Sequence, residues 1–591
     1  MNVTGIDWAI IGAFFLVSLL IGLFTSKKAG SSAKEFFLSG RNMPWWLLGV
    51  SMVATTFSAD TPNLVTDIVR KNGVAGNWTW WAFLLTGMLT VFVYAKLWRR
   101  SEVTTDLEFY ELRYSGKGAA FLRAFRAIYL GVFFNVVIMA TVSLAAIKIG
   151  GVMLGLSPVQ TLLIASVVTV VYSSLGGLKG VLLTDFFQFF IAIIGSFGAA
   201  YYIIDLPEIG SVSNLLSHEM VADKLDFFPD FSDPNAYIPF FLLPIAIQWW
   251  ATWYPGAEPG GGGYIAQRML SAKDEKNAMG ATLFFNIAHY ALRPWPWILI
   301  ALASLVIFPN ISDMQAAFPA ITEDKLGDDL AYSAMLTFLP TGLIGIVLAS
   351  LIAAVMSTLS THLNWGSSYI VNDFYLRFLK PEASDKELVA VGRISTVTLM
   401  VLSAVLALAL SSALDAFNIL LQIGAGTGLI FILRWFWWRI NAYTEISAMA
   451  ISFVVAIFFE AINPNIGLID IPEDQAYLKL IYSVSITTVG WLLVTFFTQP
   501  EKDEVLLSFY KKVSPASFGW KKILDKYPEI KQNPGQLPKE IGMMLLGSVM
   551  VYTALFSTGF FIYSEILGGI VCGLIALASG LVMLKTWKTL D

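Results

Sequence analysis

Runs of about 20 apolar residues recur along nearly the whole chain, and few polar stretches separate them. A helix needs a run of this length to cross a bilayer, where each backbone N–H and C=O must be bonded within its own segment. The composition agrees, because 56% of the 591 residues are hydrophobic and 14% are charged, against about 25% charged in soluble proteins. The chain is therefore predicted to be an all-α polytopic membrane protein.

Charged residues, Gly and Pro divide the apolar runs into fifteen predicted spans. The spans are expected near residues 6–26, 44–66, 76–97, 121–149, 158–176, 180–204, 237–270, 280–308, 331–374, 389–411, 414–438, 442–463, 476–498, 541–562 and 564–586. Most of the 38 Lys and Arg residues fall in alternate loops. The positive-inside rule then predicts an N-terminus outside and a C-terminus inside. Lys27 and Lys28 follow the first span, which is interpreted as a retained anchor rather than a signal peptide.

Several kinds of chemistry are excluded by the residues present. The chain has one cysteine, Cys572, and three histidines, His218, His289 and His362, which lie far apart in the sequence. They cannot form a disulfide framework, an iron–sulfur site or a His/Cys zinc cluster. A net charge of −4 without a long basic tract argues against nucleic acid as a partner. We find no nucleophile and base constellation, so enzyme activity is not expected.

Two of the predicted spans are interrupted near their middles. The second contains hydroxyl side chains, Asp60 and Pro62, and the seventh contains Pro255, Glu258, Pro259 and four successive glycines. Gly and Pro disfavour a helix interior, and irregular backbone inside a bilayer must be buried or line a cavity. One interruption alone is usually a kink. Carboxylates at this depth mark functional sites by default, unless the span boundary is misplaced by a turn.

The two interruptions lie five helices apart, so helices 2 to 6 and 7 to 11 cross the membrane with opposite polarity. This is the pattern of inverted-repeat transporters, in which paired broken helices indicate the binding site. We therefore divide the chain into six parts. They are an N-terminal peripheral helix at 1–30, a first inverted repeat at 31–204, a second at 237–438, peripheral helices 12 and 13 at 439–498, a Lys-rich cytoplasmic loop at 499–540 and peripheral helices 14 and 15 at 541–591.

The ninth predicted span carries four hydroxyl side chains close together, Ser357, Thr358, Ser360 and Thr361. Positions 357, 360 and 361 share one helix face. Sodium prefers oxygen ligands, and an interrupted helix frees carbonyls that such hydroxyls can complement. The alternative is that each hydroxyl bonds to the carbonyl four residues before it and only eases helix packing.

Several motifs resemble the sodium:solute symporter family, which includes the sodium/galactose, sodium/sialic acid and sodium/proline symporters. The first is Phe-Phe-Leu-Ser-Gly-Arg-Asn-Met-Pro-Trp-Trp at 36–46, followed by Gly49-Val-Ser51 and the first interruption. The others are Tyr172–Leu178 with Thr184, Asp185 and Gln188, then Tyr264–Arg268, Phe338–Gly342 and Asn372–Tyr375. The resemblance covers roughly residues 6–460. It implies a LeuT-type fold of five plus five inverted-repeat helices, a sodium site between the first and eighth core helices, and alternating access.

Carried over position by position, the resemblance implies a main sodium site. Its ligands are the backbone carbonyls of Ala54, Phe57 and Ala354 and the hydroxyls of Ser357 and Thr358. Some family members hold a second sodium ion, and the residues that match that arrangement are Asp185, Ser357, Ser360 and Thr361. The alternative for Asp185 is a position near a helix N-terminus, where a carboxylate is favoured without an ion.

The solute pocket is expected between the two interruptions and the third, eighth and eleventh spans. Galactose-type family members have a glutamine after the first interruption and a glutamate on the next helix, whereas this chain has Thr61 and Thr79. The candidate solute-binding residues are Thr56, Ser58, Asp60, Thr61, Trp78, Thr79, Glu258, Tyr264, Arg293, Asn418 and Gln422. Trp78 has the alternative of an interfacial belt, and Asn418 and Gln422 have that of packing contacts.

Arg293 lies well inside the eighth span, beside Pro294 and one turn from His289. It could bind a carboxylate or phosphate of the solute through its fork of donors. It could instead pair with Glu258 or Asp60. The internal pair is favoured, because charges inside a membrane tend to neutralise one another.

Together these features predict a sodium-coupled secondary active symporter that imports a small polar organic solute by alternating access. One or two sodium ions are expected for coupling, with no organic cofactor. The expected partners are the solute, sodium and the lipid bilayer of a plasma membrane, taken to be a bacterial inner membrane, with a monomeric transport unit. Two alternatives remain open. They are a proton-coupled transporter of the same fold, using Asp60, Asp185 or Glu258, and an ion channel, which does not need paired interruptions at one site.

Overall fold

The chain folds into a bundle of helices. The computed structural model describes residues 3–251, 258–319, 321, 326–410, 424, 426–472 and 475–587. Within these residues the β pairing is limited to an isolated bridge between Met43 and Ala272. Eleven of the described helices are long and apolar enough to cross a membrane, and shorter apolar helices lie at 45–56, 158–171 and 234–246. The all-helical membrane class is confirmed, and the number of fifteen spans stays a prediction.

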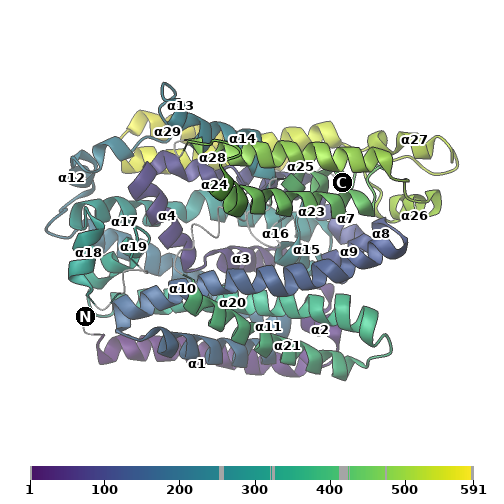
Figure 1. Ribbon diagram of the computed structural model, residues 1–591. Coiled ribbons are helices and arrows are strands. Elements are labelled where there is room, and N and C mark those ends of the chain that lie inside the picture. The colour runs from purple at the N-terminus through teal and green to yellow at the C-terminus, as the bar shows by residue number, and fades with distance from the viewer. Residues whose placement is uncertain are drawn as a thin grey trace.

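The first part of the chain contains the first interruption (Figure 1). Its helices are α1 (Gly5–Ala29), α2 (Ala33–Leu38), α3 (Trp45–Thr56), α4 (Asp60–Asn72), α5 (Trp78–Trp81), α6 (Leu84–Leu89), α7 (Ala95–Ser101), α8 (Phe109–Arg113), α9 (Gly116–Ile128), α10 (Asn135–Leu154) and α11 (Pro158–Ile204). Between α3 and α4 the chain leaves the regular helix, and the Phe57 N–H donates to the Ala54 carbonyl at 3.1 Å, one residue short of the α-helical partner. The predicted interruption of the second span is therefore present.

The predicted spans at 158–176 and 180–204 form one element, α11, that turns at Gly177. Gly177 has φ 54° and ψ −163°, a conformation that glycine adopts without the steric cost of a side chain. A continuous helix of 47 residues is far longer than a bilayer is thick, since about 20 residues suffice to cross it. The turn therefore divides α11 into two segments of suitable length.

The second part of the chain contains the second interruption. Its helices are α12 (Val212–Ser217), α13 (Pro234–Tyr237), α14 (Leu243–Ala246), α15 (Gly263–Ser271), α16 (Glu275–Ile287), α17 (Pro294–Ile307), α18 (Ile311–Ala317), α19 (Leu330–Met335), α20 (Leu343–Ser368) and α21 (Asp385–Ala409). Gly260 and Gly261 have φ of 83° and 88°, so the segment before α15 is not helical. Residues 252–257 and most of the predicted span 414–438 lie outside the described residues.

The predicted helix at 331–374 is wrong at its start. Residues 330–335 form the separate short helix α19, and α20 begins only at Leu343. Pro340 lacks a backbone donor, and Gly342 has φ 87°, so the chain turns between the two helices. At its other end α20 continues into a π-helical segment, Tyr369–Leu379.

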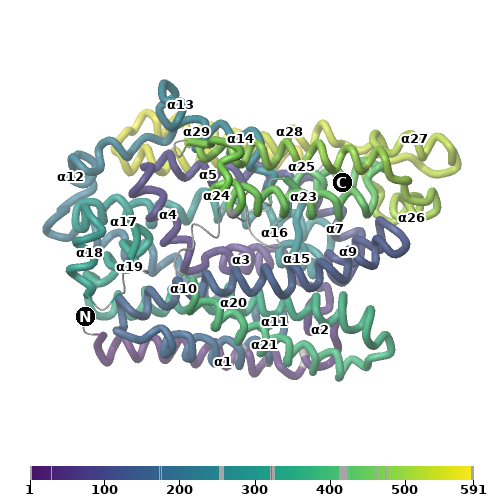
Figure 2. The backbone as a smooth tube through the Cα atoms, viewed as in Figure 1, coloured from purple at the N-terminus to yellow at the C-terminus, as the bar shows by residue number. Residues whose placement is uncertain are grey.

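The last part of the chain packs on the outside of the bundle. Its helices are α23 (Ala442–Ile457), α24 (Asn463–Ile466), α25 (Leu478–Phe497), α26 (Asp503–Val513), α27 (Lys521–Leu524), α28 (Leu537–Ile562) and α29 (Ile566–Trp587). Helices α23 and α25 pack together, as do α28 and α29. Figure 2 shows α3, α15 and α16 in the middle of the molecule, between these helices and a layer that contains α1, α11, α20 and α21. The two interrupted segments therefore lie in the interior.

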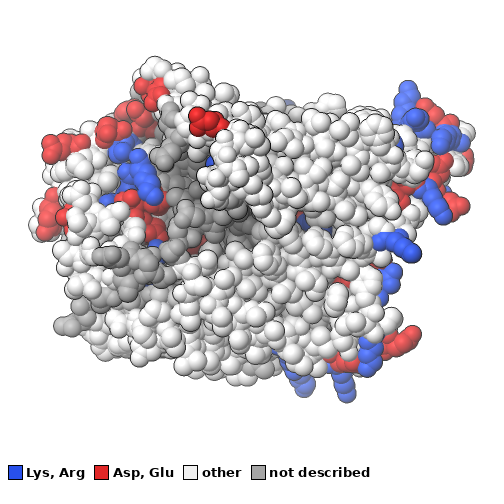
Figure 3. Space-filling view, viewed as in Figure 1, with Lys and Arg blue, Asp and Glu red and all other residues white. Residues whose placement is uncertain are grey.

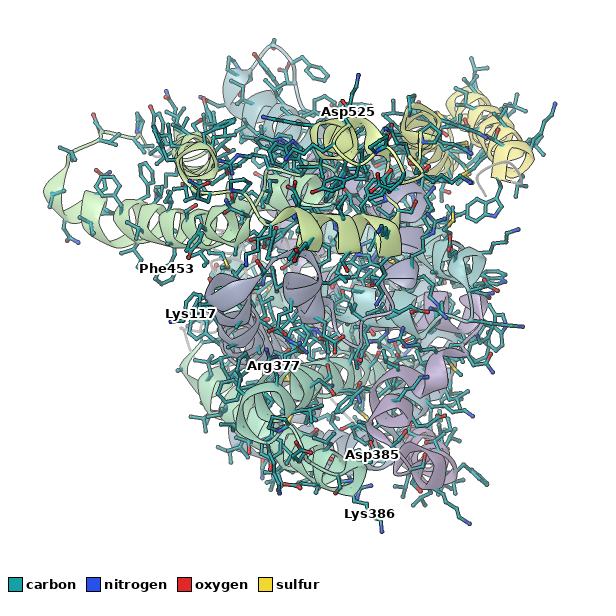
Figure 4. All side chains as sticks on the ribbon, turned by 90° about the vertical axis from the view of Figure 1, so that its right-hand side faces the viewer. Lys117, Arg377, Asp385, Lys386, Phe453 and Asp525 are labelled. Atoms are coloured by element: carbon teal, nitrogen blue, oxygen red, sulfur yellow. The ribbon has the colours of Figure 1, made fainter. Side chains whose placement is uncertain are left out.

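Charged residues gather at the two ends of the bundle (Figure 3). Most acidic side chains visible on this face lie at the end with α12 and α18, here named the acidic end. The opposite end, named the basic end, carries α8, α26 and α27 and most of the visible Lys and Arg. Figure 4 looks onto the basic end, where Lys117 and Arg377 are labelled. The charge asymmetry inferred from the loops is thus visible at the surface.

Candidate functional site

The end of α3 and the middle of α20 meet at the first interruption. Thr358 Oγ1 on α20 lies 2.7 Å from the Thr55 carbonyl oxygen and 3.0 Å from the Ala354 carbonyl oxygen. One hydroxyl thus joins the last turn of α3 to α20. The residues named for the main sodium site are all buried here, and they are Ala54, Phe57, Ala354, Ser357 and Thr358.

Asp185, on the second segment of α11, lies beside the same stretch of α20. It accepts hydrogen bonds from Ser51 Oγ at 2.5 Å and from Ser357 Oγ at 2.7 Å, and its side chain is fully buried. Ser360 Oγ instead donates to the carbonyl of Ser357 at 3.0 Å, on its own helix. Ser360 therefore takes the packing role that was the alternative for these hydroxyls.

Arg268 of α15 also lies in this cluster, and the sequence reasoning did not name it as a site residue. Its Nη2 donates to Thr361 Oγ1 at 2.8 Å and lies 3.8 Å from Asp185 Oδ2. Thr361 Oγ1 is in turn 3.0 Å from Thr55 Oγ1. Two of the residues matched to a second sodium ion, Asp185 and Thr361, thus contact a cationic side chain. The signal that could have found Arg268 is the motif Tyr264–Arg268, which lies directly after the second interruption.

A small cavity lies between α6, α15 and α16. Its volume is about 40 Å³, and Glu258 and Tyr264 line it together with Thr86, Asn286 and Tyr290. This holds a few water molecules, so an organic solute requires the surrounding helices to move. Thr86 Oγ1 and Asn286 Oδ1 have no hydrogen-bond partner in the described part of the chain. Neither residue was predicted, because a single polar residue in an apolar span gives no distinctive signal.

Glu258 is held by two buried arginines. Arg126, near the end of α9, forms an ion pair with one carboxylate oxygen, and Arg434 Nη2 lies 3.6 Å from the other. Arg434 Nη1 also lies 3.4 Å from Glu445, which accepts a hydrogen bond from Tyr114 at 2.5 Å. We name Arg126, Glu258, Arg434 and Glu445 the Glu258 cluster. Its four charges sum to zero.

Arg293 does not form the internal ion pair expected for it. Within the described residues, no carboxylate oxygen lies within 4 Å of its guanidinium group. The expectation of a pair with Glu258 is wrong, because Arg126 and Arg434 occupy both oxygens of that carboxylate. Arg293 contacts Thr56 and His289 instead.

The other candidates divide between the first interruption and its surroundings. Asp60 and Thr61 open α4 and are partly exposed, and Ser58 is buried within the interruption. Trp78 packs in an aromatic cluster, with Phe241 and Tyr552 at centroid distances of 4.8 and 5.0 Å. Its indole N–H donates to the Phe227 carbonyl, so Trp78 has a structural role in this aromatic cluster.

Three further candidates remain. Thr79 donates to the carbonyl of Gly76, in the 3-10 turn Val74–Asn77 just before α5, at 2.9 Å. Asn418 and Gln422 lie outside the described residues. Trp80, two residues beyond Trp78, is the tryptophan that stacks on Tyr290 near Arg293.

Comparison with known proteins decides the family. The model of the sodium:solute symporter family matches residues 36–452. The chain belongs to this family. The sodium/glucose cotransporter of Vibrio parahaemolyticus is 25% identical over 522 residues, which cover 84% of this chain and 92% of that protein. The human sodium/myo-inositol cotransporter 2 is 26% identical over 561 residues, covering 86% and 79%.

A solved structure supports the fold. A Na+-coupled sialic acid symporter in a substrate-bound outward-open state superposes with a TM-score of 0.66 at 20% identity, covering 84% of this chain and 99% of that one. This likeness shows the LeuT-type fold expected from the motifs. The family and its curated relatives are sodium-coupled transporters rather than enzymes.

Proposed function

We propose that this protein imports a small polar organic solute together with sodium by alternating access. The single observation that carries the proposal is the position of Thr358, whose hydroxyl lies within 3.0 Å of carbonyls from both α3 and α20. A sodium ion between these helices would find hydroxyl and carbonyl oxygens only, which are the ligands that hard cations prefer. The proposed ligands are the carbonyls of Ala54, Phe57 and Ala354 and the hydroxyls of Ser357 and Thr358.

We propose one coupling ion for the conformation described. Asp185 has Arg268 3.8 Å away, and Thr361 accepts a hydrogen bond from that arginine. A second sodium ion among the same oxygens would be repelled by the guanidinium group. Arg268 therefore supplies the positive charge that a second sodium ion would bring. A second ion could bind only after a motion of α15 had moved Arg268 away.

Coupling follows from thermodynamics. Sodium can favour solute binding only as far as it binds the solute-competent conformation more tightly than the other. Bound sodium would join α20 to the end of α3 and order the interruption where the solute binds. Each inward sodium ion gains about 2.3 kcal/mol per 100 mV of membrane potential, in addition to its concentration gradient.

The remaining architecture is proposed on the same grounds. Residues 31–204 and 237–438 are the two inverted repeats, and 1–30, 439–498 and 541–591 are peripheral. The positive-inside rule places the basic end, with the loop 499–540, in the cytoplasm. The N-terminus would then lie outside and the C-terminus inside.

The test is thermal unfolding of the purified full chain in sodium chloride and in choline chloride. A ligand of the native state at 100 times its Kd adds about 2.7 kcal/mol of stability. The parent should be stabilised by sodium, and the double variant Ser357→Ala/Thr358→Ala should not. Thr396→Ala is the matched control, because that buried hydroxyl bonds only to its own helix, at the Gly392 carbonyl. If sodium has no effect on the parent and stability follows pH instead, proton coupling is the better account.

A further inference from the structure

Arg293 is a buried cation at the first interruption, and Asp60 interacts with it electrostatically from beyond ion-pair distance. The Arg293 side chain is 1% exposed, and within the described residues no carboxylate lies within 4 Å of it. Its Nη1 donates to Thr56 Oγ1 at 3.2 Å and to the Val53 carbonyl at 3.4 Å, and its Nη2 contacts His289. In the described part of the chain, no group forms a hydrogen bond with its Nε. A buried charge that is neither paired nor fully hydrogen-bonded is costly, so its retention requires a reason.

A second buried arginine shows how such a charge is held when it serves the fold. Arg113 also has no carboxylate within 4 Å among the described residues. It donates to the backbone carbonyls of Arg434, Trp437 and Trp438 at 3.0 to 3.3 Å. Three aromatic rings surround it at about 5 Å. Arg113 Nη1 also lacks a hydrogen-bond partner among the described residues. Arg293 likewise has aromatic rings beside it, Phe57 at 5.5 Å and Trp297 at 5.1 Å. It differs in having a single backbone carbonyl contact, at 3.4 Å, where Arg113 has three.

Three features of the surroundings of Arg293 indicate that a ligand binds there. The arginine lies at the junction between the π-helical segment Ala288–Leu292 and α17, just before Pro294, which has no backbone N–H. It interacts electrostatically with Tyr290, Tyr264 and Asp60. Tyr264 and Tyr290 also line the small cavity. The guanidinium group therefore lies at a break in the helix and interacts with residues of the cavity wall.

We propose that Arg293 binds a carboxylate group of the transported solute. This rests on the proposed function, because it assigns the substrate class of the same transport site. The fork of donors on a guanidinium matches a carboxylate, and the unpartnered Nε is one arm of that fork. Thr56 and His289 are positioning residues, since they contact the two terminal nitrogens of the guanidinium group.

The charges in the site favour a single negative charge on the solute. One guanidinium can bind one carboxylate, and a second negative charge would have no cation to pair with in a site that also holds Asp60. A phosphate monoester, with about −1.5 to −2 charges at pH 7, is therefore a poorer fit than a monocarboxylate. Asp60 Oδ1, which has no hydrogen-bond donor among the described residues, can accept a hydroxyl or ammonium hydrogen of the same solute.

The test uses matched pairs of compounds on the purified full chain in sodium chloride. A panel of monocarboxylates, amino acids and sugar acids is compared with the corresponding uncharged compounds, such as L-lactate with L-lactamide and D-glucuronate with D-glucose. We expect thermal stabilisation by at least one carboxylate and none by its neutral partner. Arg293→Gln should weaken that binding by on the order of 100-fold or more, and Arg293→Lys by less, because it keeps the charge but loses the fork.

Arg113→Gln is the matched control, since it removes an equally buried guanidinium that does not face the interruption. It should lower stability without changing which compounds bind. Binding of a neutral compound that survives in Arg293→Gln would overturn the proposal, as would the absence of any carboxylate binder in the panel. Sodium chloride alone should stabilise the parent and Arg293→Gln equally. If it fails to stabilise the parent, the proposed sodium coupling fails, whatever the result for the solutes.

Discussion

The Glu258 cluster and the surroundings of Arg293 both bury arginine in the same helix bundle, and they treat its charge differently. In the cluster, Arg126 and Arg434 meet the carboxylates of Glu258 and Glu445, and the charges cancel. Around Arg293 there is a hydroxyl and an imidazole instead. Buried charges that form ion pairs can serve the fold alone. A buried charge without an ion pair, at an interrupted helix, indicates a ligand that binds from solution.

The cluster is also completed by aromatic packing. The Arg126 guanidinium lies 4.8 Å from the Phe431 ring and 5.5 Å from the Tyr110 ring, and Arg434 lies 4.5 Å from Phe109. These rings exclude water, so the ion pairs act in a medium of low dielectric constant. Glu258 anchors the second interruption to α9 and to the segment before α23. We therefore assign it to the fold rather than to the solute.

The largest expected effect comes from unbalancing the matched cluster. Glu258→Gln leaves Arg126 and Arg434 with one carboxylate between them, and breaking a buried ion pair on one side costs about 3–5 kcal/mol. We expect a marked fall in the unfolding temperature, or failure to recover folded protein. The matched control is Glu565→Gln, which removes an exposed carboxylate and should change little.

A second variant distinguishes the effect of the lost charge balance from the effect of altered side-chain packing. The pair Arg126→Gln/Glu258→Gln removes one charge of each sign, so it should be more stable than the sum of the two single effects predicts. A Glu258→Gln protein that unfolds at the parent temperature would contradict the assignment of this cluster to stability.

The next effect compares the two arginines that lack carboxylates. Arg113→Gln loses charged donors to three backbone carbonyls, and we expect a cost on the order of 3 kcal/mol. Arg293→Gln removes an uncompensated buried charge, so in the absence of solute its stability should lie within about 1 kcal/mol of the parent or above it. Thermal unfolding of both variants in sodium chloride measures the difference. Equal destabilisation by the two would show that Arg293 is a structural residue like Arg113.

The smallest effect is expected at the surface of the basic end. Arg377 Nη2 lies 2.9 Å from Glu111, but the arginine side chain is 47% exposed, so Arg377→Gln should cost no more than about 1 kcal/mol. Burial alone would raise the pKa of the Glu111 carboxyl, but hydrogen bonds from Arg377 and Arg123 hold it below its ordinary value of 4.5.

The sign of the pH dependence follows from that lowered pKa. The contribution of Glu111 to stability is complete above the pKa of the unfolded chain and is lost as the pH falls through the lower folded value. Stability measured from pH 7 to pH 3 should therefore fall less in Arg377→Gln than in the parent. A steeper fall in the variant would mean that Glu111 is not stabilised by this arginine.

The sequence predicted the fold well where local chemistry decides it. Interrupted helices follow directly from Pro and Gly in apolar runs, and both interruptions are present. The separate helix α19 was missed, because the apolar pattern continues across Pro340 and Gly342 and hides the turn. The class of the protein could thus be predicted from periodicity and motifs.

The partners of the buried charges could not be predicted in the same way. Arg126 and Arg434 fall in the predicted spans 121–149 and 414–438, far from Glu258 in the sequence, and only tertiary packing brings them to it. Trp78 and Trp80 are two residues apart on one helix, so their side chains point in different directions. The sequence could not show which of them packs on His289 and Tyr290, beside Arg293. The proposed sodium ligands stay a prediction that the buried hydroxyl positions support.

Uptake into proteoliposomes tests the central claim most directly. The full chain is reconstituted, the membrane potential is clamped, and accumulation of a carboxylate that binds in an Arg293-dependent way is measured under an inward sodium gradient or an inward proton gradient. The account predicts accumulation above equilibrium with the sodium gradient alone, and its loss in Ser357→Ala/Thr358→Ala. Accumulation that follows the proton gradient without sodium, or equilibration without accumulation, would contradict it.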